Sequence, residues 1–344
     1  MFLPLNKTLI IAEAGINHDG DFEAAKKHVD AAVAAGANFV KFQSFVAEEL
    51  VLPEADRSTY IIEGSHEGES FRDLLKRLEL NRDQQRALNE YCKERGIKFL
   101  STAFDLASLD FLCDELECEV IKVASADLTN LRFLRHCATK GLPVILSTGM
   151  ADLPEIDEAL ETLQTAGAQE LCILHCVSWY PSEFEMINLR AMHTIRDRYG
   201  LPVGYSDHSL GTTIPAAAVA MGARCIEKHF TLDPTAFGPD HAASLSPDEL
   251  IEMVVRIREV EVALGTGALG PQDILPIELD QRNVHRRSVV TTKAVQKGEV
   301  FTEENLGIKR PGSGIQPREL DFVLGKTAAR DIQSEVLLER DDIA

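Results

Sequence analysis

The sequence predicts an α/β protein: an eight-stranded (β/α)8 barrel, the TIM-barrel architecture, followed by a small β-rich domain. Eight short apolar runs alternate with helical patterns over the first 266 residues. The runs are continuously apolar, which suits parallel strands covered on both faces. Polar residues follow nearly every run. An open doubly wound sheet would collect them only at its switch point, whereas the strand ends of a barrel all meet at one mouth.

The strands and helices are predicted from these runs and from end signals. The expected strands are Leu9–Ala14, Phe39–Gln43, Lys98–Thr102, Val120–Ala124, Val144–Thr148, Leu171–Val177, Val203–Ser206 and Cys225–His229. The expected helices include Asp21–Ala35, Asp83–Arg95, Pro154–Ala166, Thr212–Gly222 and one ending at Leu264. Gly36 and Gly96 follow two of these helices at the C′ position, and Ser246 with Glu249 forms a capping box before the last.

Two segments depart from the alternation. Val46–Leu80 is a long insertion after the second strand, and we expect a lid or rim there with a helix at Ser70–Leu78. Beyond the eighth helix the alternation of strands and helices gives way to a linker and then to short strands and turns. The sequence therefore predicts a barrel domain over residues 1–266, a linker over 267–283 and a β-rich domain over 284–344.

Composition narrows the class of protein. The 344 residues carry a net charge of −20, which argues against nucleic acid or an anionic membrane as the main partner. No apolar run approaches ~20 residues, and the N-terminus lacks a signal-peptide layout. The seven cysteines are odd in number and lie mostly in apolar patterns. We therefore expect reduced thiols in a cytoplasmic protein.

Two histidines suggest a metal site. His208 and His229 end consecutive predicted strands, and Asp207, Glu227 and Asp240 are near them in the sequence. A single histidine at such a place is more often a hydrogen-bonded core residue. Two at neighbouring strand ends beside carboxylates favour a divalent ion, with Mn, Zn, Fe or Co suited to a mixed N/O site.

Two lysines suggest an anionic substrate. Lys41 and Lys122 each lie inside an apolar strand, and a buried lysine needs an anion. Hydroxyl groups that could help to bind a phosphate come from other strand ends: Thr102, Ser125, Ser147 and Ser206. A lysine aldolase that forms a Schiff base would use the same feature without a metal. A sugar-binding or scaffolding protein is a further alternative, although binding alone would not require two metal histidines.

Ten segments in order along nearly the whole chain resemble the sialic acid synthase (N-acetylneuraminate synthase) family. They are IIAEAGINHDGD (Ile10–Asp21), VKFQSF (Val40–Phe45), STAFD (Ser101–Asp105), IKVASADLTN (Ile121–Asn130), LSTGM (Leu146–Met150), YPSEFEMINL (Tyr180–Leu189), GYSDHSLG (Gly204–Gly211), EKHFTLD (Glu227–Asp233), GPDHAASLSPDEL (Gly238–Leu250) and KRPGSGIQP (Lys309–Pro317). The C-terminal part resembles the antifreeze-like (SAF, β-clip) domain of that family.

The resemblance implies a reaction and a set of roles. The family condenses phosphoenolpyruvate with the open-chain aldehyde of an N-acetylated amino sugar, using a divalent metal such as Mn, Mg or Co. His208 and His229 would hold the metal, and Glu13 and Asp127 would be catalytic, with Asp127 handling the water. Phosphoenolpyruvate would contact Lys41, Thr102, Lys122, Ser125, Ser147 and Ser206. The sugar and metal side would contain Glu13, Gln43, Tyr180 and Asp240, with Ser178 as a further substrate-binding residue.

The same resemblance implies a domain-swapped homodimer in which Arg310 reaches the sugar in the partner's site. Two residues depart from the family pattern: Ser178 stands where Asn is common, and Asp127 where Glu is common. GPDHAASL is closer to the sialic and legionaminic branches than to the pseudaminic one. N-acetylmannosamine or a diacetamido hexose is therefore the expected acceptor, with a pseudaminic-acid-type synthase as the alternative.

Overall fold

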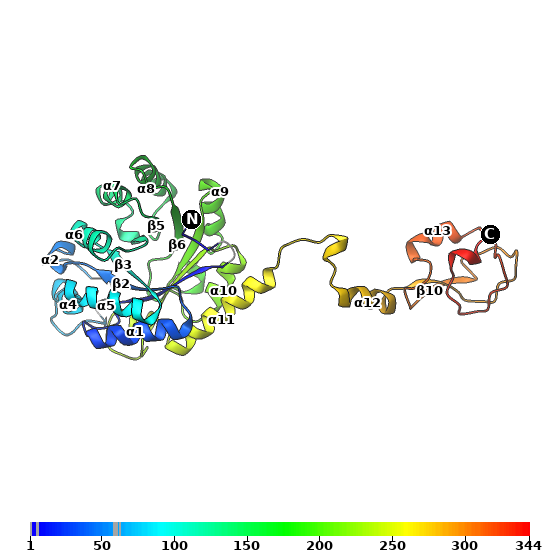
Figure 1. The fold of residues 1–344 in the computed structure, drawn as a ribbon, viewed down its shortest axis with the longest axis horizontal. Helices are drawn as coiled ribbons and strands as arrows, with labels where there is room; N and C mark the ends of the chain where they lie inside the picture. Colours follow the sequence, from blue (N-terminus) through cyan, green and yellow to red (C-terminus); the bar gives the residue numbers. More distant parts are fainter. Residues whose placement is uncertain (1, 5–6, 58–60, 62) are drawn as a thin grey trace. The chain divides into compact units, whose positions relative to one another are not determined.

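The computed structural model describes residues 2–4, 7–57, 61 and 63–344. The chain divides into two compact units, and the boundary between them in the sequence falls between Gly265 and Thr266. Within the first unit, eight parallel strands close into a barrel surrounded by helices (Figure 1). The strands are β1 (Leu9–Gly15), β2 (Phe39–Ser44), β3 (Lys98–Ala103), β4 (Ile121–Val123), β5 (Val144–Ser147), β6 (Leu171–Cys176), β7 (Val203–Asp207) and β8 (Cys225–His229). The predicted barrel is confirmed, with every strand end within one residue of its expected place.

The side chains that point into the barrel change from apolar to polar toward the carboxyl ends of the strands. The lower barrel interior is filled by Leu3, Leu9, Ile11, Phe39, Leu100, Val120, Ile145, Cys172, Leu174 and Cys225. Side chains two apart on a strand point to the same side, so the next inward positions face the mouth. These positions are Glu13, Lys41, Thr102, Lys122, Ser147, Cys176 and Glu227. The floor is therefore apolar, and the layer above it carries charge.

A second apolar layer lies between the strands and the outer helices. The outer helices are α1 (Phe22–Ala35), α5 (Arg82–Arg95), α6 (Leu106–Asp110), α7 (Leu131–Thr139), α8 (Leu153–Thr165), α9 (Ala191–Tyr199), α10 (Thr213–Ala220) and α11 (Pro247–Leu264). Their ends follow the predicted signals: the Asp21 side chain caps α1, and Gly36 closes it with a φ of 75°. Among the residues that the structure describes, no helix has the length and apolar content to span a bilayer.

The 46–80 insertion has an apolar cluster of its own. It contains α2 (Ala47–Leu50) and α4 (Phe71–Leu78), and the predicted helix at Ser70–Leu78 is confirmed, with the Ser70 side chain as its N-cap. Positions 58–60 and 62 of the predicted insertion lie outside the described residues. The cluster comprises Ile16, Phe45, Ala47, Ile61, Leu74, Leu75 and Leu78. This packing fixes the insertion beside the ends of β1 and β2.

The second unit is small and rich in short β pairings. β9 (Ser288–Thr291) and β10 (Leu306–Lys309) pair antiparallel, and isolated bridges join further residues such as Val295 and Ile332. Its core includes Val289, Val295, Phe301, Leu306, Ile315, Val323, Ala328, Ile332 and Leu338. Two helices accompany the strands, α12 (Pro276–His285) and α13 (Leu320–Val323). The predicted linker 267–283 therefore contains most of α12.

Candidate active site

A cavity of about 590 Å³ opens at the carboxyl ends of the barrel strands. It is lined by the predicted site residues Glu13, Lys41, Gln43, Thr102, Lys122, Ser125, Asp127, Ser147, Ser178, Tyr180, Ser206, His208, His229 and Asp240. The structure thus brings together every predicted site residue of the barrel. Glu227, which the sequence placed near the two histidines without a role of its own, also lines the cavity. Cys176 and a group of apolar side chains from the 46–80 insertion line it too, and these were not predicted.

Two lysines and two glutamates form a buried cluster at the bottom of the cavity. Lys41 Nζ lies 3.0 Å from Glu13 Oε2 and 3.4 Å from Glu227 Oε2. Lys122 Nζ lies 3.7 Å from Glu227 Oε1. The anion that each buried lysine requires is therefore supplied by the barrel itself. Glu227 lies between the two lysines.

Hydroxyl groups complete the bonding of this cluster. Lys41 donates to Thr102 Oγ1 at 3.0 Å, and Lys122 donates to Ser147 Oγ at 2.7 Å. The Ser206 hydroxyl donates to Glu227 Oε1 at 2.9 Å. Three of the predicted hydroxyl residues thus contact the charged groups, each from a different strand.

The carboxyl groups of the cluster have very different acidities. Burial raises the pKa of Glu13 to about 7, despite the nearby Lys41. Burial also opposes ionisation of Glu227, but Lys122 and Lys41 outweigh it and lower the pKa of Glu227 to about 2. Two titratable groups whose acidities are pushed apart within one cavity are characteristic of acid–base chemistry.

His208 and His229 lie together beside this cluster, with ring centroids 5.4 Å apart. His208 Nδ1 lies 2.6 Å from the Val177 carbonyl oxygen, so it carries the proton and leaves Nε2 available as a ligand. His229 Nδ1 is buried without a hydrogen-bond partner among the described residues and lies 3.7 Å from Asp240 Oδ2. The Tyr180 ring packs against His208, at 4.0 Å between centroids.

This donor set fits a divalent ion held by two imidazoles. Among the described residues, no group of three or more His, Cys, Asp or Glu side chains is arranged as a metal site. His208 and His229 would be the protein's two ligands to such an ion, and water or substrate would complete its coordination.

Asp207, which the sequence placed beside these histidines, faces the other way. It pairs with Lys228 at 2.6 Å, and both side chains are 0% exposed. The reason is strand parity: Ser206 and His208 point into the barrel, so Asp207 points out. The expectation that Asp207 supports a metal at the mouth is wrong.

Three polar side chains of the predicted sugar side converge around Gly15. A Cβ at Gly15 would lie 3.3 Å from Glu13 Oε1, 3.4 Å from Gln43 Nε2 and 3.5 Å from Asp240 Oδ2. The φ of Gly15 is +53°, a conformation that side-chain-bearing residues rarely adopt. Burial raises the pKa of Asp240 to about 6. Glu13, Gln43 and Asp240 thus present donors and acceptors to one small region.

Gly149 allows two serines to approach each other on the opposite side. Its backbone N–H donates to Ser125 Oγ at 2.9 Å. A Cβ there would lie 2.3 Å from Ser178 Oγ, so only glycine leaves room for both hydroxyls. Asp127 is half-buried nearby and accepts a hydrogen bond from Asn130 at 3.0 Å. Burial raises the pKa of Asp127.

Arg310, the remaining predicted site residue, belongs to the second unit. It is exposed and directly follows β10.

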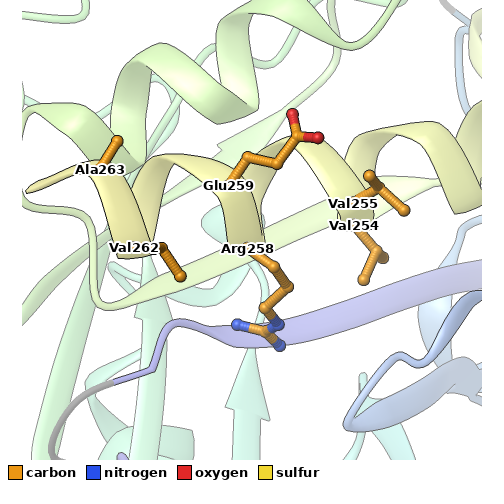
Figure 2. A pocket seen from close by; sticks show the side chains of 6 residues that line it. All are labelled: Val254, Val255, Arg258, Glu259, Val262 and Ala263. Carbon is orange, nitrogen blue, oxygen red and sulfur yellow. The ribbon is translucent and has the colours of Figure 1, made fainter.

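A second hollow, of about 540 Å³, lies along the outer face of α11 (Figure 2). It is lined by Val254, Val255, Arg258, Glu259, Val262 and Ala263. Arg258 is engaged with Glu261 at 2.8 Å and with the Thr8 carbonyl oxygen. No set of polar groups converges there, so the barrel mouth is the candidate active site.

Comparisons with known proteins place the chain in a family. The NeuB family matches residues 28–268, and the SAF domain matches residues 286–344. The chain is 43% identical to N,N'-diacetyllegionaminic acid synthase of Campylobacter jejuni, over 97% of this chain and 99% of the relative. It is 42% identical to the enzyme of the same name in Legionella pneumophila, over 96% of this chain and 92% of the relative.

A crystal structure of the N-acetylneuraminic acid (sialic acid) synthetase from Leptospira borgpetersenii, in complex with citrate, is also similar. The TM-score is 0.71 at 38% identity, over 81% of this chain and 92% of the other. The chain therefore belongs to the NeuB family and is an enzyme of the sialic acid synthase type, with a (β/α)8 barrel followed by an SAF domain.

Proposed function

We propose that this enzyme condenses phosphoenolpyruvate with an N-acetylated amino sugar to give a nine-carbon, sialic-acid-type 2-keto acid and phosphate. The observation that carries the proposal is the buried cluster of Lys41, Lys122, Glu13 and Glu227 beside two histidines on adjacent strands. The cations and hydroxyls suit a small phosphorylated acid, and the histidines suit a polarised aldehyde.

The reaction balances as follows. The C3 carbon of phosphoenolpyruvate forms a bond to the aldehyde carbon of the sugar, and the aldehyde oxygen takes a proton. Water adds at C2 and loses one proton, which leaves a C2 hydroxyl group. That hydroxyl then becomes the ketone: its proton passes to the phosphate, which leaves with cleavage of the C–O bond. Burial raises the pKa of Glu13 to about 7, so its carboxyl group can carry a proton at neutral pH. Glu13 is the proton donor to the aldehyde oxygen. Asp127 accepts the proton of the water.

Binding of phosphoenolpyruvate falls to the residues around the lysine cluster. Lys122 with Ser147, and Lys41 with Thr102, present paired donors from neighbouring strands. Ser125 and Ser206 add hydroxyls from the same cavity. Gln43, Ser178, Tyr180 and Asp240 contact the sugar, whose hydroxyl and amide groups match their mixed donors and acceptors.

His208 and His229 would hold a divalent cation, with Mn, Mg or Co as the candidates. When bound, it would act as a Lewis acid toward the sugar carbonyl. The histidine rings are positioned for this role by the Val177 carbonyl and by the packing of Tyr180.

The proposal includes a cytoplasmic, domain-swapped homodimer in which Arg310 contacts the acyl group of a sugar bound by the partner. The high identity to the two legionaminic acid synthases supports a diacetamido hexose as the acceptor, with N-acetylmannosamine the other expected sugar. A pseudaminic-acid-type acceptor is the alternative.

The test is phosphate release from phosphoenolpyruvate across a panel of N-acetyl hexosamines and diacetamido hexoses. We expect release that needs an acceptor, stops with EDTA, returns with Mn²⁺ and is absent in His208→Ala. Full activity after thorough chelation would contradict the metal assignment. Trapping of the substrate on a lysine by borohydride would instead identify a Schiff-base aldolase or lyase.

A further inference from the structure

Two loops at the barrel mouth contain polar residues to which the proposed reaction gives no role. The loop after β1 contains Asn17 and Asp19, from the segment IIAEAGINHDGD. The loop after β8 contains His241 and Ser244, from the segment GPDHAASL. Asp19 is half-buried, and the other three are buried. Buried polar side chains need hydrogen-bond partners, and these four find them in one another. We call them the loop-contact residues.

His241 joins the two loops through both nitrogens of its ring. Nε2 lies 3.1 Å from Asp19 Oδ2, and Nδ1 lies 2.6 Å from Thr231 Oγ1. A carboxylate only accepts hydrogen bonds, so Nε2 carries a proton and donates it to Asp19. Thr231 is fully buried and lies just beyond the end of β8. The His241 ring is therefore held from both sides.

A second connection between the loops runs through Asn17. Its Nδ2 donates to Ser244 Oγ at 2.9 Å and to the carbonyl oxygen of Phe230 at 2.9 Å. The Ser244 hydroxyl donates in turn to the carbonyl oxygen of Asp240 at 2.6 Å. The amide of Asn17 is therefore connected, through one serine, to the backbone of a residue that lines the cavity.

Gly238 shows how closely the β8 loop passes over the His241–Asp19 pair. A Cβ at Gly238 would lie 2.7 Å from His241 Cδ2 and 3.0 Å from Asp19 Oδ1. A residue with a side chain at this position would push the two partners apart. Glycine, which has no Cβ, leaves room for their contact.

Asp240 lies between the two connections. His241 follows it directly in the chain, and Ser244 bonds to its carbonyl oxygen. The side chain of Asp240 faces the cavity, where its Oδ2 and Oε1 of Glu13 would lie 3.5 Å and 3.3 Å from a Cβ at Gly15. Glu13 is on β1, directly before the loop that supplies the other partners. The contacts between the loops therefore fix the position of Asp240 relative to Glu13.

We propose that the four loop-contact residues are positioning residues, which hold Asp240 in place to bind the acceptor sugar. This inference rests on the proposed function, in which Asp240 contacts the sugar. In the part of the chain that the structure describes, none of the four lines the cavity, so they act on the sugar through Asp240. A displacement of about 1 Å at such a contact can cost about 10²-fold in rate. Phosphoenolpyruvate binds at the lysine cluster and should be unaffected.

Asp19→Gly tests the connection with a small change. Asp19 has a φ of 52°, a conformation that glycine adopts readily, so the substitution removes the carboxylate without straining the backbone. With the full-length enzyme and the best acceptor of the sugar panel, kcat/KM for the sugar should fall by about ten- to a hundredfold. The KM for phosphoenolpyruvate should change by less than about twofold. Asp19→Asn keeps an acceptor oxygen for His241 and should retain most of the activity.

Glu117→Gly is the matched control. Glu117 is exposed, has a φ of 53° and precedes β4, at the amino ends of the barrel strands and away from the mouth. The substitution removes a carboxylate from the same backbone conformation. It should leave kcat/KM for the sugar and the KM for phosphoenolpyruvate unchanged. Thermal melting of each variant checks that it is folded.

A double variant tests whether Asp19 acts through Asp240. Asp240→Asn should itself lower kcat/KM for the sugar. If Asp19 only positions Asp240, adding Asp19→Gly to Asp240→Asn should cause a further loss of less than about twofold. The same fold loss in both backgrounds would show that Asp19 acts independently of Asp240 and would refute the inference.

The outcomes separate the positioning role from the proposed function. A kcat/KM for the sugar that Asp19→Gly leaves unchanged, or that Glu117→Gly lowers equally, would refute the positioning role and leave the proposed function standing. An equal loss for phosphoenolpyruvate would also refute it, because the whole mouth would then have been disturbed. If Asp240→Asn uses the sugar as well as the wild type does, the assignment of Asp240 fails, and the positioning role fails with it. If the wild type releases no phosphate with any acceptor, the proposed function itself fails.

Discussion

The ammonium nitrogen of Lys122 lies 3.7 Å from Oε1 of Glu227, and the two side chains are only 2% and 7% exposed. Lys41 contacts the other oxygen of the same carboxylate at 3.4 Å. One buried carboxylate thus contacts two lysines and holds them in place before any substrate arrives. Such preorganised cations stabilise a bound anion without having to be desolvated and ordered during binding.

Lys122→Met should raise the KM for phosphoenolpyruvate by about 10²–10³-fold, because it removes a buried charged contact worth several kcal/mol. The KM for the sugar should change little, since Lys122 is assigned to phosphoenolpyruvate in the proposed function. Steady-state kinetics with each substrate varied in turn give both values.

Lys228→Met is the matched control. Lys228 is equally buried and comes from β8, but it pairs with Asp207 outside the cavity. It should lower the melting temperature without raising the KM for phosphoenolpyruvate. A similar KM in Lys122→Met and wild type would show that this lysine does not bind the substrate.

Asp127→Asn should lower kcat by about 10²–10⁴-fold while both substrates still bind, because a general base contributes about that much. Asp127→Glu restores a carboxylate and should recover part of the loss. A tracer checks the associated bond cleavage: oxygen-18 in the bridging position of phosphoenolpyruvate should leave with phosphate. Label retained in the sugar acid would mean P–O cleavage and a different mechanism.

Arg310→Ala should raise the KM for the sugar and leave that for phosphoenolpyruvate nearly unchanged. The prediction depends on the assignment of Arg310 to the acyl group, and sedimentation analysis should show a dimer. Kinetics on a diacetamido hexose would measure the effect.

Subunit exchange tests whether Arg310 acts in trans. Mixing Arg310→Ala with His208→Ala creates mixed dimers. If the arginine reaches the partner's site, one site carries both defects and the other carries neither, so activity returns. If it acts within its own chain, each site keeps one defect and mixing restores nothing.

His28 should make the barrel sensitive to acid. Its side chain is 0% exposed, and burial lowers the pKa of His28 from 6.5 to about 4. The unfolded chain therefore binds more protons than the folded one between these pH values. Stability should fall by roughly 3 kcal/mol as the pH drops from about 6.5 to about 4.

His28→Leu removes the titrating group and should flatten this slope by up to about 1.4 kcal/mol per pH unit. Urea unfolding at a series of pH values measures it. An unaltered slope in His28→Leu would show that another group controls acid unfolding.

The strands and most of the site could be predicted from the sequence because parallel strands are continuous apolar runs with polar ends. Glu227 was underestimated, although a signal was present. His229 was expected to point inward, and on a strand Glu227 must then point inward too. The same parity turns Asp207 outward. The alternation of side chains along the seventh and eighth strands therefore predicts that Glu227, and not Asp207, pairs with the buried lysines.

The apolar surface that the 46–80 insertion turns toward the cavity could not be predicted in the same way. The insertion looks polar in composition, and its apolar residues, such as Leu50, Phe71 and Leu75, are spread over two helices and the loops between them. They become one surface only through packing against Ile16 and Phe104 from the barrel loops.

The ion pairs of Lys41 have a consequence for how the molecule folds. Lys41 is on β2, Glu13 on β1 and Glu227 on β8, so its two partners lie on either side of the seam where the first strand meets the last. Contacts of such wide sequence separation are slow to form, because bringing the two ends of so long a segment together costs conformational entropy before the contact stabilises the fold. A partly folded barrel without β8 would leave this lysine with a single partner. The charged centre of the active site is therefore among the last features to be completed during folding.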